Sequence, residues 1–459
     1  SFIFSCSVNV EDSDSNSNSS SSNCSSTKNL SASTKVPLLV VRVQYTNATF
    51  NSSESVWAEK MFGTSEGELN HYLEETTYNK YQFSPVSETS GCADDGVVTV
   101  TMSTVHPNTQ RTSWSCHAVS AITETDSYVD YSSFDTDNNG KLSITELQVI
   151  FLIAGGESAT GINSPGGVWG QATALLCDAN GDGSYADASG EHGVTLDSVR
   201  LLGLTSSSYG QNGYSQFGER QGSSSSNTWD ATIGVIAHEL GHAYFQLPDL
   251  YCTSGSCEGI GNFGVMGSGV WGYKSSSEKA GSSPVHLSAW SKENISACAP
   301  QSIDNGTSNL TLPAVFKSST HASSCGIFKA STSTSGEYFL LENRTTGGYD
   351  QGFYYLLLDG TSSFAVGNSF SGGLAIWHIK DILSNCLDNN TCQTQSPPLV
   401  DLEEANNGDL DNGSSRGRST NLYYSGNSST FDNSSTPNSK LYNNSASGIS
   451  ISSISAAGE

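Results

Sequence analysis

The chain has 459 residues, which is long enough for two or three domains that each bury a core of ordinary size. Its 45 acidic residues face only 19 Lys and Arg residues, and the formal net charge is −26. Such a charge repels polyanions, so we expect neither nucleic acid nor an acidic membrane surface as a partner. No apolar run approaches the roughly 20 residues that cross a bilayer, so no membrane span is expected.

Residue usage indicates an exported glycoprotein. Charged residues make up only 14% of the chain, so neutral polar groups, glycans or bound cations must supply solubility. Eleven cysteines, with the close pairs Cys252/Cys257 and Cys386/Cys392, predict disulfide-closed loops in an oxidising compartment. We therefore expect a secreted protein whose leader has been removed before Ser1. Candidate acceptors of N-linked glycans are Asn47, Asn51, Asn294, Asn305, Asn309, Asn343, Asn389, Asn412, Asn427 and Asn433.

The first half of the chain predicts a mixed domain of strands and helices. Residues 1–34 are rich in Ser and Asn and read as an arm that cannot repay the entropy of ordering. The apolar, β-branched runs Val36–Tyr45 and Leu147–Gly156 predict buried strands. Helices are expected over Glu66–Asn79 and over Cys116–Tyr131.

The stretch TWDATIGVIAHELGHAYFQL predicts a helix with one buried face, because its apolar residues recur at steps of three and four. Within it, His238 and His242 are four residues apart and can offer ring nitrogens to one metal ion. Glu239 lies beside the first of them, where a general base would activate a zinc-bound water. Two histidines and a glutamate on a solvated helix face are the alternative interpretation.

The third zinc ligand is expected to be Asp249 in the following QLPDLY segment. An aspartate after a proline is also common in turns, and Glu258 just beyond Cys257 is an alternative oxygen ligand. Met266, between two glycines, is placed to form a tight turn beneath the zinc. Tyr251 or Tyr273 could stabilise the oxyanion of a peptide substrate.

These segments together resemble the immune-inhibitor-A-type secreted metallopeptidases, relatives of the metzincins that carry HExGH, then LPD and a methionine turn. LNHYLEETTYNKYQFSPV, LQVIFLIAGG, PVHLSAWSKENI, EYFLLENRTTGGYD and GLAIWHIKD are similar to family segments and follow in the expected order. The resemblance implies an α+β fold. We expect a metzincin-like zinc peptidase domain with a mixed sheet and an active-site helix over 35–297. After about Cys298 the chain changes to short apolar runs separated by Gly, Ser and Asn clusters, which predict a second, all-β, sandwich-like domain over 298–459.

One departure from the family pattern concerns the approach to Asp249. The family usually shows HExxHxxGxxD, whereas Phe245 stands here at the glycine position and Asp249 comes one residue later. Glycine there lets the chain turn sharply out of the helix. Phe245 therefore predicts a helix that continues further and a loop that returns differently.

The sequence DTDNNGKLSITE matches the twelve-residue calcium loop of an EF-hand. Because a strand and not a helix follows, we expect one structural calcium ion rather than a paired sensor. The expected oxygen ligands come from Asp135, Asp137, Asn139, Lys141 (its carbonyl), Ser143 and Glu146, with Gly140 at the turn.

A second segment, DANGDGSYADAS, begins in the same way but ends in Ser189 where a bidentate glutamate belongs. A second calcium ion is therefore a weaker expectation. Its ligands would be Asp178, Asn180, Asp182, Ser184 and Asp187.

The predicted function is that of a secreted, calcium-stabilised zinc endopeptidase acting on proteins or peptides, with Glu239 as general base. His378 and Glu342 lie in apparent strands and are expected to make structural hydrogen bonds rather than a second metal site. Two alternatives stay open. One is an inactive protein of the same fold with a structural or adhesive role outside the cell, and the other is a calcium-dependent surface binder.

Overall fold

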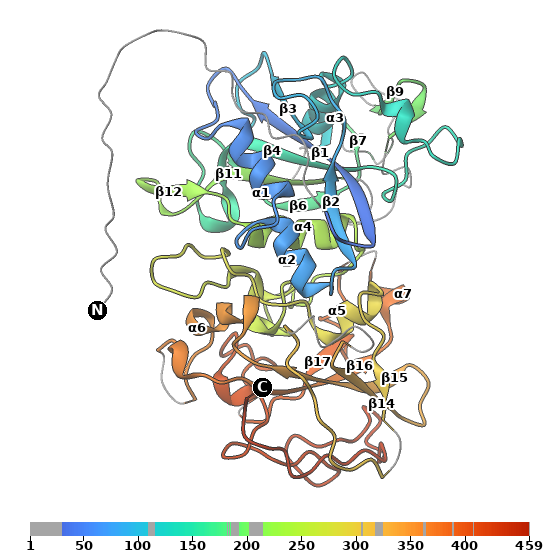
Figure 1. The fold of residues 1–459 in the computed structure, drawn as a ribbon, viewed down its shortest axis with the longest axis vertical. Coiled ribbons are helices and arrows are strands. Elements are labelled where there is room, and N and C mark those ends of the chain that lie inside the picture. Colours follow the sequence, from blue (N-terminus) through green and yellow to red (C-terminus); the bar gives the residue numbers. More distant parts are fainter. Residues whose placement is uncertain are drawn as a thin grey trace, which may run out of the picture.

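The computed structural model describes residues 30–108, 115–180, 182, 184, 192–201, 214–303, 306–316, 325–360, 364–387, 390–406 and 408–458. Most of the predicted N-terminal arm, residues 1–29, lies outside this description. Two parts follow each other along the long axis of the molecule, the earlier residues forming one end and the later residues the other (Figure 1).

The N-terminal part is built on an eight-stranded sheet whose main path runs β12-β11-β4-β1-β2. The predicted central strands are β1 (Thr34–Gln44) and β4 (Gln148–Glu157), which pair in parallel. The other strands of this sheet are β2 (Tyr81–Pro85), β3 (Val97–Thr101), β5 (Gly167–Val168), β6 (Gln171–Thr173), β11 (Tyr214–Ser224) and β12 (Asn227–Asp230). Strands β6 and β12 are antiparallel to β11, and the rest are parallel to their neighbours, so the sheet is mixed.

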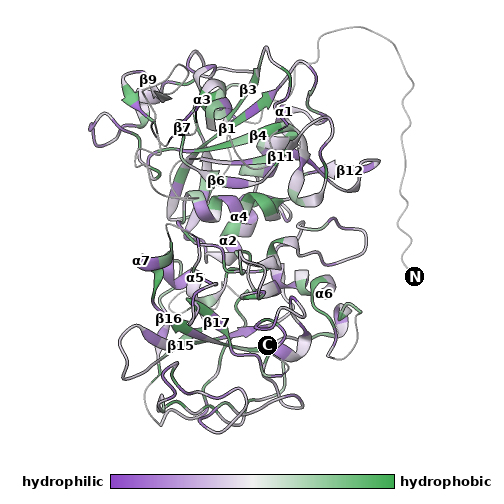
Figure 2. Cartoon of the chain, turned by 180° about the vertical axis from the view of Figure 1, so that it is seen from behind, coloured by the Kyte–Doolittle hydropathy of each residue, from purple (hydrophilic) through white to green (hydrophobic). Residues whose placement is uncertain are grey.

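Alternation along the central strands divides the apolar side chains between the two faces of the sheet. Leu38 and Val40 face one hydrophobic cluster, whereas Leu39 and Val41 face another. Every residue of β4 is buried, as expected for a parallel strand covered on both sides. The hydrophobic colouring of these strands is visible in Figure 2.

Helices cover both faces. The cluster on one face includes residues of α1 (Glu54–Phe62), α2 (Leu69–Thr76) and α4 (Ile233–Ala243), and the cluster on the other includes residues of α3 (Ser115–Thr123). Both α2 and α3 are shorter than predicted. Gly67 with a φ of 90° precedes α2, and Tyr78 and Asn79 with positive φ follow it, so the backbone cannot continue the helix at either end.

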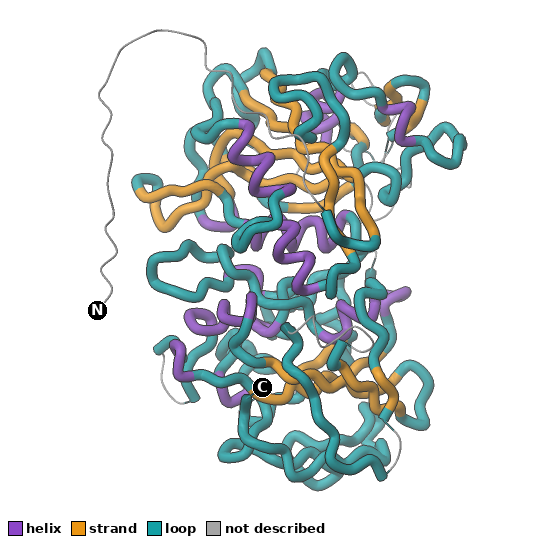
Figure 3. Tube along the Cα trace, in the orientation of Figure 1, coloured by secondary structure: helices purple, strands orange, loops and turns teal. Residues whose placement is uncertain are grey.

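The C-terminal part contains one five-stranded sheet in the order β13-β14-β15-β16-β17. Its strands are β13 (Gln301–Ser302), β14 (Ile327–Ser331), β15 (Glu337–Arg344), β16 (Gly373–Lys380) and β17 (Val400–Leu402). Short helices α5 (Ala289–Asn294), α6 (Phe353–Leu356) and α7 (Leu383–Cys386) lie around it, and most of the remaining chain is loop (Figure 3).

This arrangement differs from the predicted all-β sandwich. Among the described residues after 297 the second large sheet of a sandwich is missing, and the segments from 404 onward form turns and isolated bridges. Short apolar runs between Gly, Ser and Asn residues occur both in strands and in ordered loops that pack on a sheet. Composition alone did not distinguish strands from such loops here. The remaining short strands, all before residue 201, are β7 (Leu176–Cys177), β8 (His192–Gly193), β9 (Thr195–Leu196) and β10 (Val199–Arg200).

The two parts share a hydrophobic core. One cluster joins Ile236 and Leu240 of α4 with Trp377 of β16 and Leu402 of β17. The apolar packing in this cluster is therefore continuous across the predicted domain boundary between residues 297 and 298. Burial of apolar area across the junction stabilises both parts together.

A buried ion pair lies at the same junction. Arg344 donates two hydrogen bonds of 2.7 Å to Asp350 and one of 2.6 Å to the Phe263 carbonyl. Arg344 also contacts Glu342, which accepts a hydrogen bond from Trp377, so Glu342 has the structural role predicted for it. Although burial alone would raise the pKa of Asp350, the Arg344 guanidinium lowers it.

Four disulfides lie within the described residues, and they include the two close pairs predicted from the sequence. They join Cys116 to Cys177, Cys252 to Cys257, Cys298 to Cys325 and Cys386 to Cys392. A search of the described helices finds none with the length and apolar character needed to span a bilayer.

Replacing Arg344 with Met is expected to destabilise the protein by about 3–5 kcal/mol, because it leaves Asp350 as an uncompensated buried charge. Chemical denaturation measures this change. Arg220→Met is the matched control, since its pair with Asp230 is partly exposed and its loss should cost much less. Equal effects of the two variants would contradict the assignment.

Stability is expected to fall as pH rises because of Glu404. Burial raises the pKa of Glu404 from 4.5 to about 8, and the neighbouring Asp411 and Asp401 add to the rise. The folded state favours the neutral acid, so this contribution is complete below pH 4.5 and is lost as pH rises to about 8.

Glu404→Gln should flatten the fall of thermal stability across this window, by at most about 1.4 kcal/mol per pH unit. Glu124→Gln, at an exposed position, is the control. A pH profile of Glu404→Gln that superimposes on that of the wild type would refute the role of this group.

Candidate metal centre

Helix α4 lies against the sheet at the junction of the two parts, and all eleven of its residues are buried. Thr232 precedes it in an extended conformation and donates a hydrogen bond of 3.0 Å to Gln221. Burial on all sides means that His238, Glu239 and His242 are not on a solvated helix face, which removes the alternative interpretation of the motif.

Backbone carbonyls fix both imidazoles. His238 Nδ1 lies 2.9 Å from the Val265 carbonyl, and His242 Nδ1 lies 2.6 Å from the Leu247 carbonyl. A carbonyl oxygen only accepts, so each Nδ1 carries a proton, and in the neutral form of each ring the lone pair is then on Nε2. The two Nε2 atoms are 3.2 Å apart.

Helix α4 ends close to Phe245. Its last residue is Ala243, and Gln246 adopts a φ of 55° while its N–H donates to the His242 carbonyl. This is a left-handed helix ending, and the residue that makes it comes one position after Phe245. Helical hydrogen bonding thus continues one residue past the position at which the family has glycine, because Gln246 and not Phe245 takes the conformation for which glycine is usual. The extra residue is absorbed in this turn.

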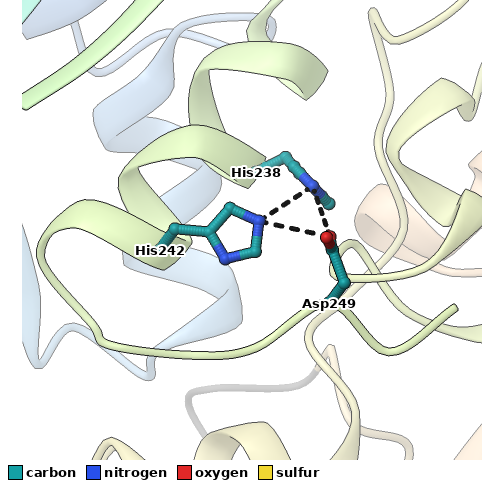
Figure 4. A group of neighbouring side chains, drawn as sticks. All are labelled: His238, His242 and Asp249. Atoms are coloured by element: carbon teal, nitrogen blue, oxygen red, sulfur yellow. Dashed lines mark hydrogen bonds and ion pairs between the residues drawn. The ribbon is translucent and has the colours of Figure 1, made fainter. Parts of the chain in front are cut away.

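The returning loop brings Asp249 to the two histidines (Figure 4). Its Oδ1 lies 3.1 Å from His238 Nε2 and 3.2 Å from His242 Nε2. One ligand atom from each of these three residues lies within 4.8 Å of the others.

These donors fit a zinc ion. Asp249 Oδ1 is buried without a hydrogen-bond partner, and it faces two ring nitrogens whose protons are on the opposite side of each ring. Three lone pairs that converge in a buried place repel one another unless a proton or a cation lies between them. Two imidazoles and one carboxylate form a ligand set that suits zinc and leaves an open position.

Glu239 is 5% exposed and lines the same cavity as the three donors. Burial raises its pKa to about 8, with additional contributions from the negative charges of Asp249 and Glu157. A Cβ added at Gly170 would lie 3.1 Å from Glu239 Oε1, so the chain passes close to this carboxylate.

Met266 lies beneath the helix, in the place expected for a methionine turn. A Cβ added at Gly241 would lie 2.5 Å from the Met266 sulfur, so glycine is what allows the close approach. The Met266 carbonyl accepts a hydrogen bond of 2.8 Å from Leu250, the residue after Asp249. The turn therefore contacts both the helix and the returning loop.

The donors open into a cavity of about 680 Å³. Trp169, Val235, Val270 and Trp271 give its wall apolar surface, and Glu258 and Arg416 line it as well. Tyr251 belongs to this wall and its ring stacks near His238, with ring centres 6.3 Å apart. Tyr273 instead stacks on Tyr355 and is not among the lining residues, so Tyr251 is the better placed of the two.

The alternative ligand Glu258 lies in the cavity, but its carboxylate is paired with Arg416 at 3.4 Å. Asp249 and not Glu258 shares a cluster with the histidines. The sequence interpretation missed Asn390, which lines the cavity from the C-terminal part and contacts Asp249. Only the close spacing of Cys386 and Cys392 marks its loop in the sequence.

The segment predicted to bind the first calcium ion forms a tight turn at Gly140. Gly140 has a φ of 76°, and Asp135 accepts hydrogen bonds from the N–H groups of Asn139 and Gly140. Asp135, Asp137 and Glu146 each offer an oxygen to one cluster. Hydrogen bonds from Ser143 and Thr136 outweigh burial and lower the pKa of Glu146.

Arg200 fastens this loop to the domain. Its carbonyl accepts a hydrogen bond of 2.8 Å from Leu142, and its N–H donates to the Gly140 carbonyl at 2.9 Å. Lys141, whose carbonyl is an expected ligand, forms a β-bridge with the same residue.

The second loop is described only in part. Asp182 accepts hydrogen bonds from Asn180 and Ser184, and Asp178 precedes them. Asp187 and Ser189 lie outside the described residues. This calcium site stays a prediction.

The glycan acceptors fall into three groups. Exposed residues are Asn47, Asn51, Asn294, Asn309, Asn412 and Asn433. Asn343 and Asn427 each donate two hydrogen bonds to backbone carbonyls through the side-chain amide, which makes them poor acceptors. Asn305 and Asn389 lie outside the described residues.

His378 makes the structural contacts predicted for it. Its Nδ1 lies 3.0 Å from Glu403, and its Nε2 lies 3.2 Å from Glu337. Its ring also stacks on Tyr442 with centres 4.2 Å apart. Burial lowers the pKa of His378 despite the neighbouring carboxylates.

Comparison with known protein families gives one match. Residues 221–298 match the model of the immune inhibitor A peptidase M6 catalytic domain, and this segment contains α4, Asp249 and Met266. The match confirms the resemblance predicted from the sequence. The search of curated proteins gives no match.

Proposed function

Because residues 221–298 match the model of the immune inhibitor A peptidase M6 catalytic domain, we propose that the chain is a secreted, calcium-stabilised zinc endopeptidase. One observation carries the proposal. His238, His242 and Asp249 aim three unprotonated donor atoms at one point, in a cavity that Glu239 also lines.

Each chain residue has a separate task in this mechanism. Bound zinc would supply Lewis acidity to a water molecule and to the substrate carbonyl. Glu239 accepts a proton from the attacking water and donates it to the leaving amine. Glu239 is a buried carboxyl on the wall of the cavity into which the three donors open, a position from which it can perform both transfers. Val265 and Leu247 keep the imidazoles in the tautomer that leaves Nε2 free.

The cavity suits a polypeptide substrate. Its mixed wall of Trp169, Trp271 and Val270 offers apolar contacts to side chains, and Tyr251 stands beside His238 as a hydrogen-bond donor for the developing oxyanion. Arg416 and Glu258 add charge at the wall. Disulfides and an excess of neutral polar residues support export to an oxidising compartment.

The rival proposal, an inactive protein with a structural or adhesive role, rested on the altered spacing after His242. The turn at Gln246 absorbs the extra residue and brings Asp249 to the histidines. The altered spacing therefore no longer supports an inactive protein, and we do not favour that proposal.

Glu239→Gln is expected to lower peptidase activity by roughly 10²- to 10⁴-fold, because an amide cannot accept the proton. Zinc content should be unchanged, since Glu239 is not one of the three donors. Cleavage of an unfolded protein substrate, together with metal analysis, measures both quantities.

The exposed Glu124→Gln serves as control and should retain full activity. The peptidase proposal would be contradicted if the purified wild-type protein contained no zinc and showed no cleavage that a chelator inhibits.

We further propose that Asp135, Asp137, Asn139, Lys141, Ser143 and Glu146 bind one structural calcium ion. The loop leads directly into β4, the buried strand next to β11, so an ion there would fix one end of the central sheet.

Removal of calcium with a calcium-selective chelator is therefore expected to lower the melting temperature. Saturation at 100 times the dissociation constant contributes about 2.7 kcal/mol of stability. Glu146→Gln should abolish this calcium-dependent shift, and Glu124→Gln should preserve it. A shift that survives in Glu146→Gln would place the ion elsewhere.

A further inference from the structure

Among the described residues of the C-terminal part, Asn390 contacts the candidate ligand Asp249 through its side chain. This residue belongs to the loop between Cys386 and Cys392, which a disulfide closes. It is 141 positions away from Asp249 in the sequence, yet the two side chains are in direct contact. Asn390 also lines the cavity into which the three donors open.

The contact has two hydrogen bonds of opposite direction. Asn390 Nδ2 donates to Asp249 Oδ2 at 2.5 Å, and the Asp249 N–H donates to Asn390 Oδ1 at 2.8 Å. A single carboxamide thus holds both the backbone and the carboxylate of the candidate ligand. With Oδ2 occupied, Oδ1 is the oxygen that faces the two imidazoles at 3.1 and 3.2 Å.

Two further features fix the position of Asn390: its own backbone conformation and the contacts of the nearby Gln393. Asn390 has a φ of 51°, a left-handed conformation that asparagine tolerates better than most residues. Gln393, which follows Cys392 directly, donates a hydrogen bond of 3.3 Å to the carbonyl of Leu250, the residue after Asp249. The same amide also donates to the Val400 carbonyl at 2.8 Å, which fastens the segment to β17.

The chemistry of the side chain suits this position. A carboxamide donates a hydrogen bond to a carboxylate without cancelling its charge, so Asp249 keeps the full negative charge that a divalent cation favours. A lysine or arginine in the same place would compete with the ion. Partners of this kind, which orient a ligand without touching the metal, affect metal affinity substantially.

We propose that Asn390 is a positioning residue of the metal centre: it selects which oxygen of Asp249 is presented to the ion. This inference rests on the proposed zinc site. It also implies that the centre is complete only when the C-terminal part is docked against the N-terminal part.

The test compares zinc affinities by chelator competition in the full chain. Asn390→Gly keeps the left-handed backbone available and removes both hydrogen bonds, and it should weaken zinc binding by roughly 10- to 100-fold. Asn444→Gly is the matched control. Asn444 is also an asparagine with positive φ, it is exposed, and it lies outside the cavity wall. Its substitution should leave zinc affinity unchanged.

A double-mutant cycle separates positioning from a general effect on folding. In the Asp249→Ala background, Asn390→Gly should cause no further loss of zinc affinity, because the residue through which it acts is gone. A loss that persists in that background, or wild-type affinity in Asn390→Gly, would overturn the inference while leaving the zinc site in place. Failure of the wild type to bind zinc would instead overturn the proposed function.

Asn390→Asp provides a second measurement if the glycine variant does not fold. It keeps the side-chain size and the acceptor for the Asp249 N–H, but it replaces the donor with a like charge. The visible absorption spectrum of the cobalt(II)-substituted protein should then differ from that of the wild type, because Asp249 can no longer hold its orientation. An unchanged spectrum would count against the proposal.

Discussion

Three lone pairs that point at one another, from His238, His242 and Asp249, are the constraint on which the rest of the site depends. In the absence of a cation this arrangement is costly, so the surrounding chain must hold each donor in place. The Val265 and Leu247 carbonyls hold the rings, and Asn390 holds the carboxylate. Each of these supports comes from a different segment of the chain.

Those supports depend in turn on the contact between the two parts. Arg344 from β15 donates to the Phe263 carbonyl, two residues before Val265, and is held by Asp350. Asp350 also accepts a hydrogen bond from the N–H of His286, whose carbonyl accepts from Val265. The loop that orients His238 is thus fixed on both sides by a buried ion pair from the C-terminal part. The apolar packing that both parts share around α4 also holds the two parts together.

The sequence predicted best where a residue's role is local. Periodicity in α4 and the spacing of His238 and His242 place two donors on one helix face, and the calcium loop is a contiguous string. The buried runs of β1 and β4 identified the central strands within one or two residues. Asp249 was predicted from the QLPDLY segment that follows the helix, and the residue with positive φ that ends the helical turn is Gln246, one position after Phe245.

What the sequence did not predict depends on contacts between distant segments. Nothing around Asn390 or Arg344 marks either as a partner of the catalytic part, since both relations arise from how β15, β16 and α7 dock. The predicted all-β sandwich differs from the single five-stranded sheet of the C-terminal part for a related reason. The same apolar runs can form strands or packed loops, and only tertiary packing decides between them.

The preformed donor set has a consequence for how the ion and the fold depend on each other. In a small zinc-binding domain the metal supplies the folding energy, and its removal unfolds the chain. Here the Val265 and Leu247 carbonyls, the Asn390 carboxamide and the buried helix α4 also hold the donor residues, through contacts that belong to the fold itself. The residues that would hold the ion are therefore part of the same core and hydrogen bonds that join the two parts of the chain.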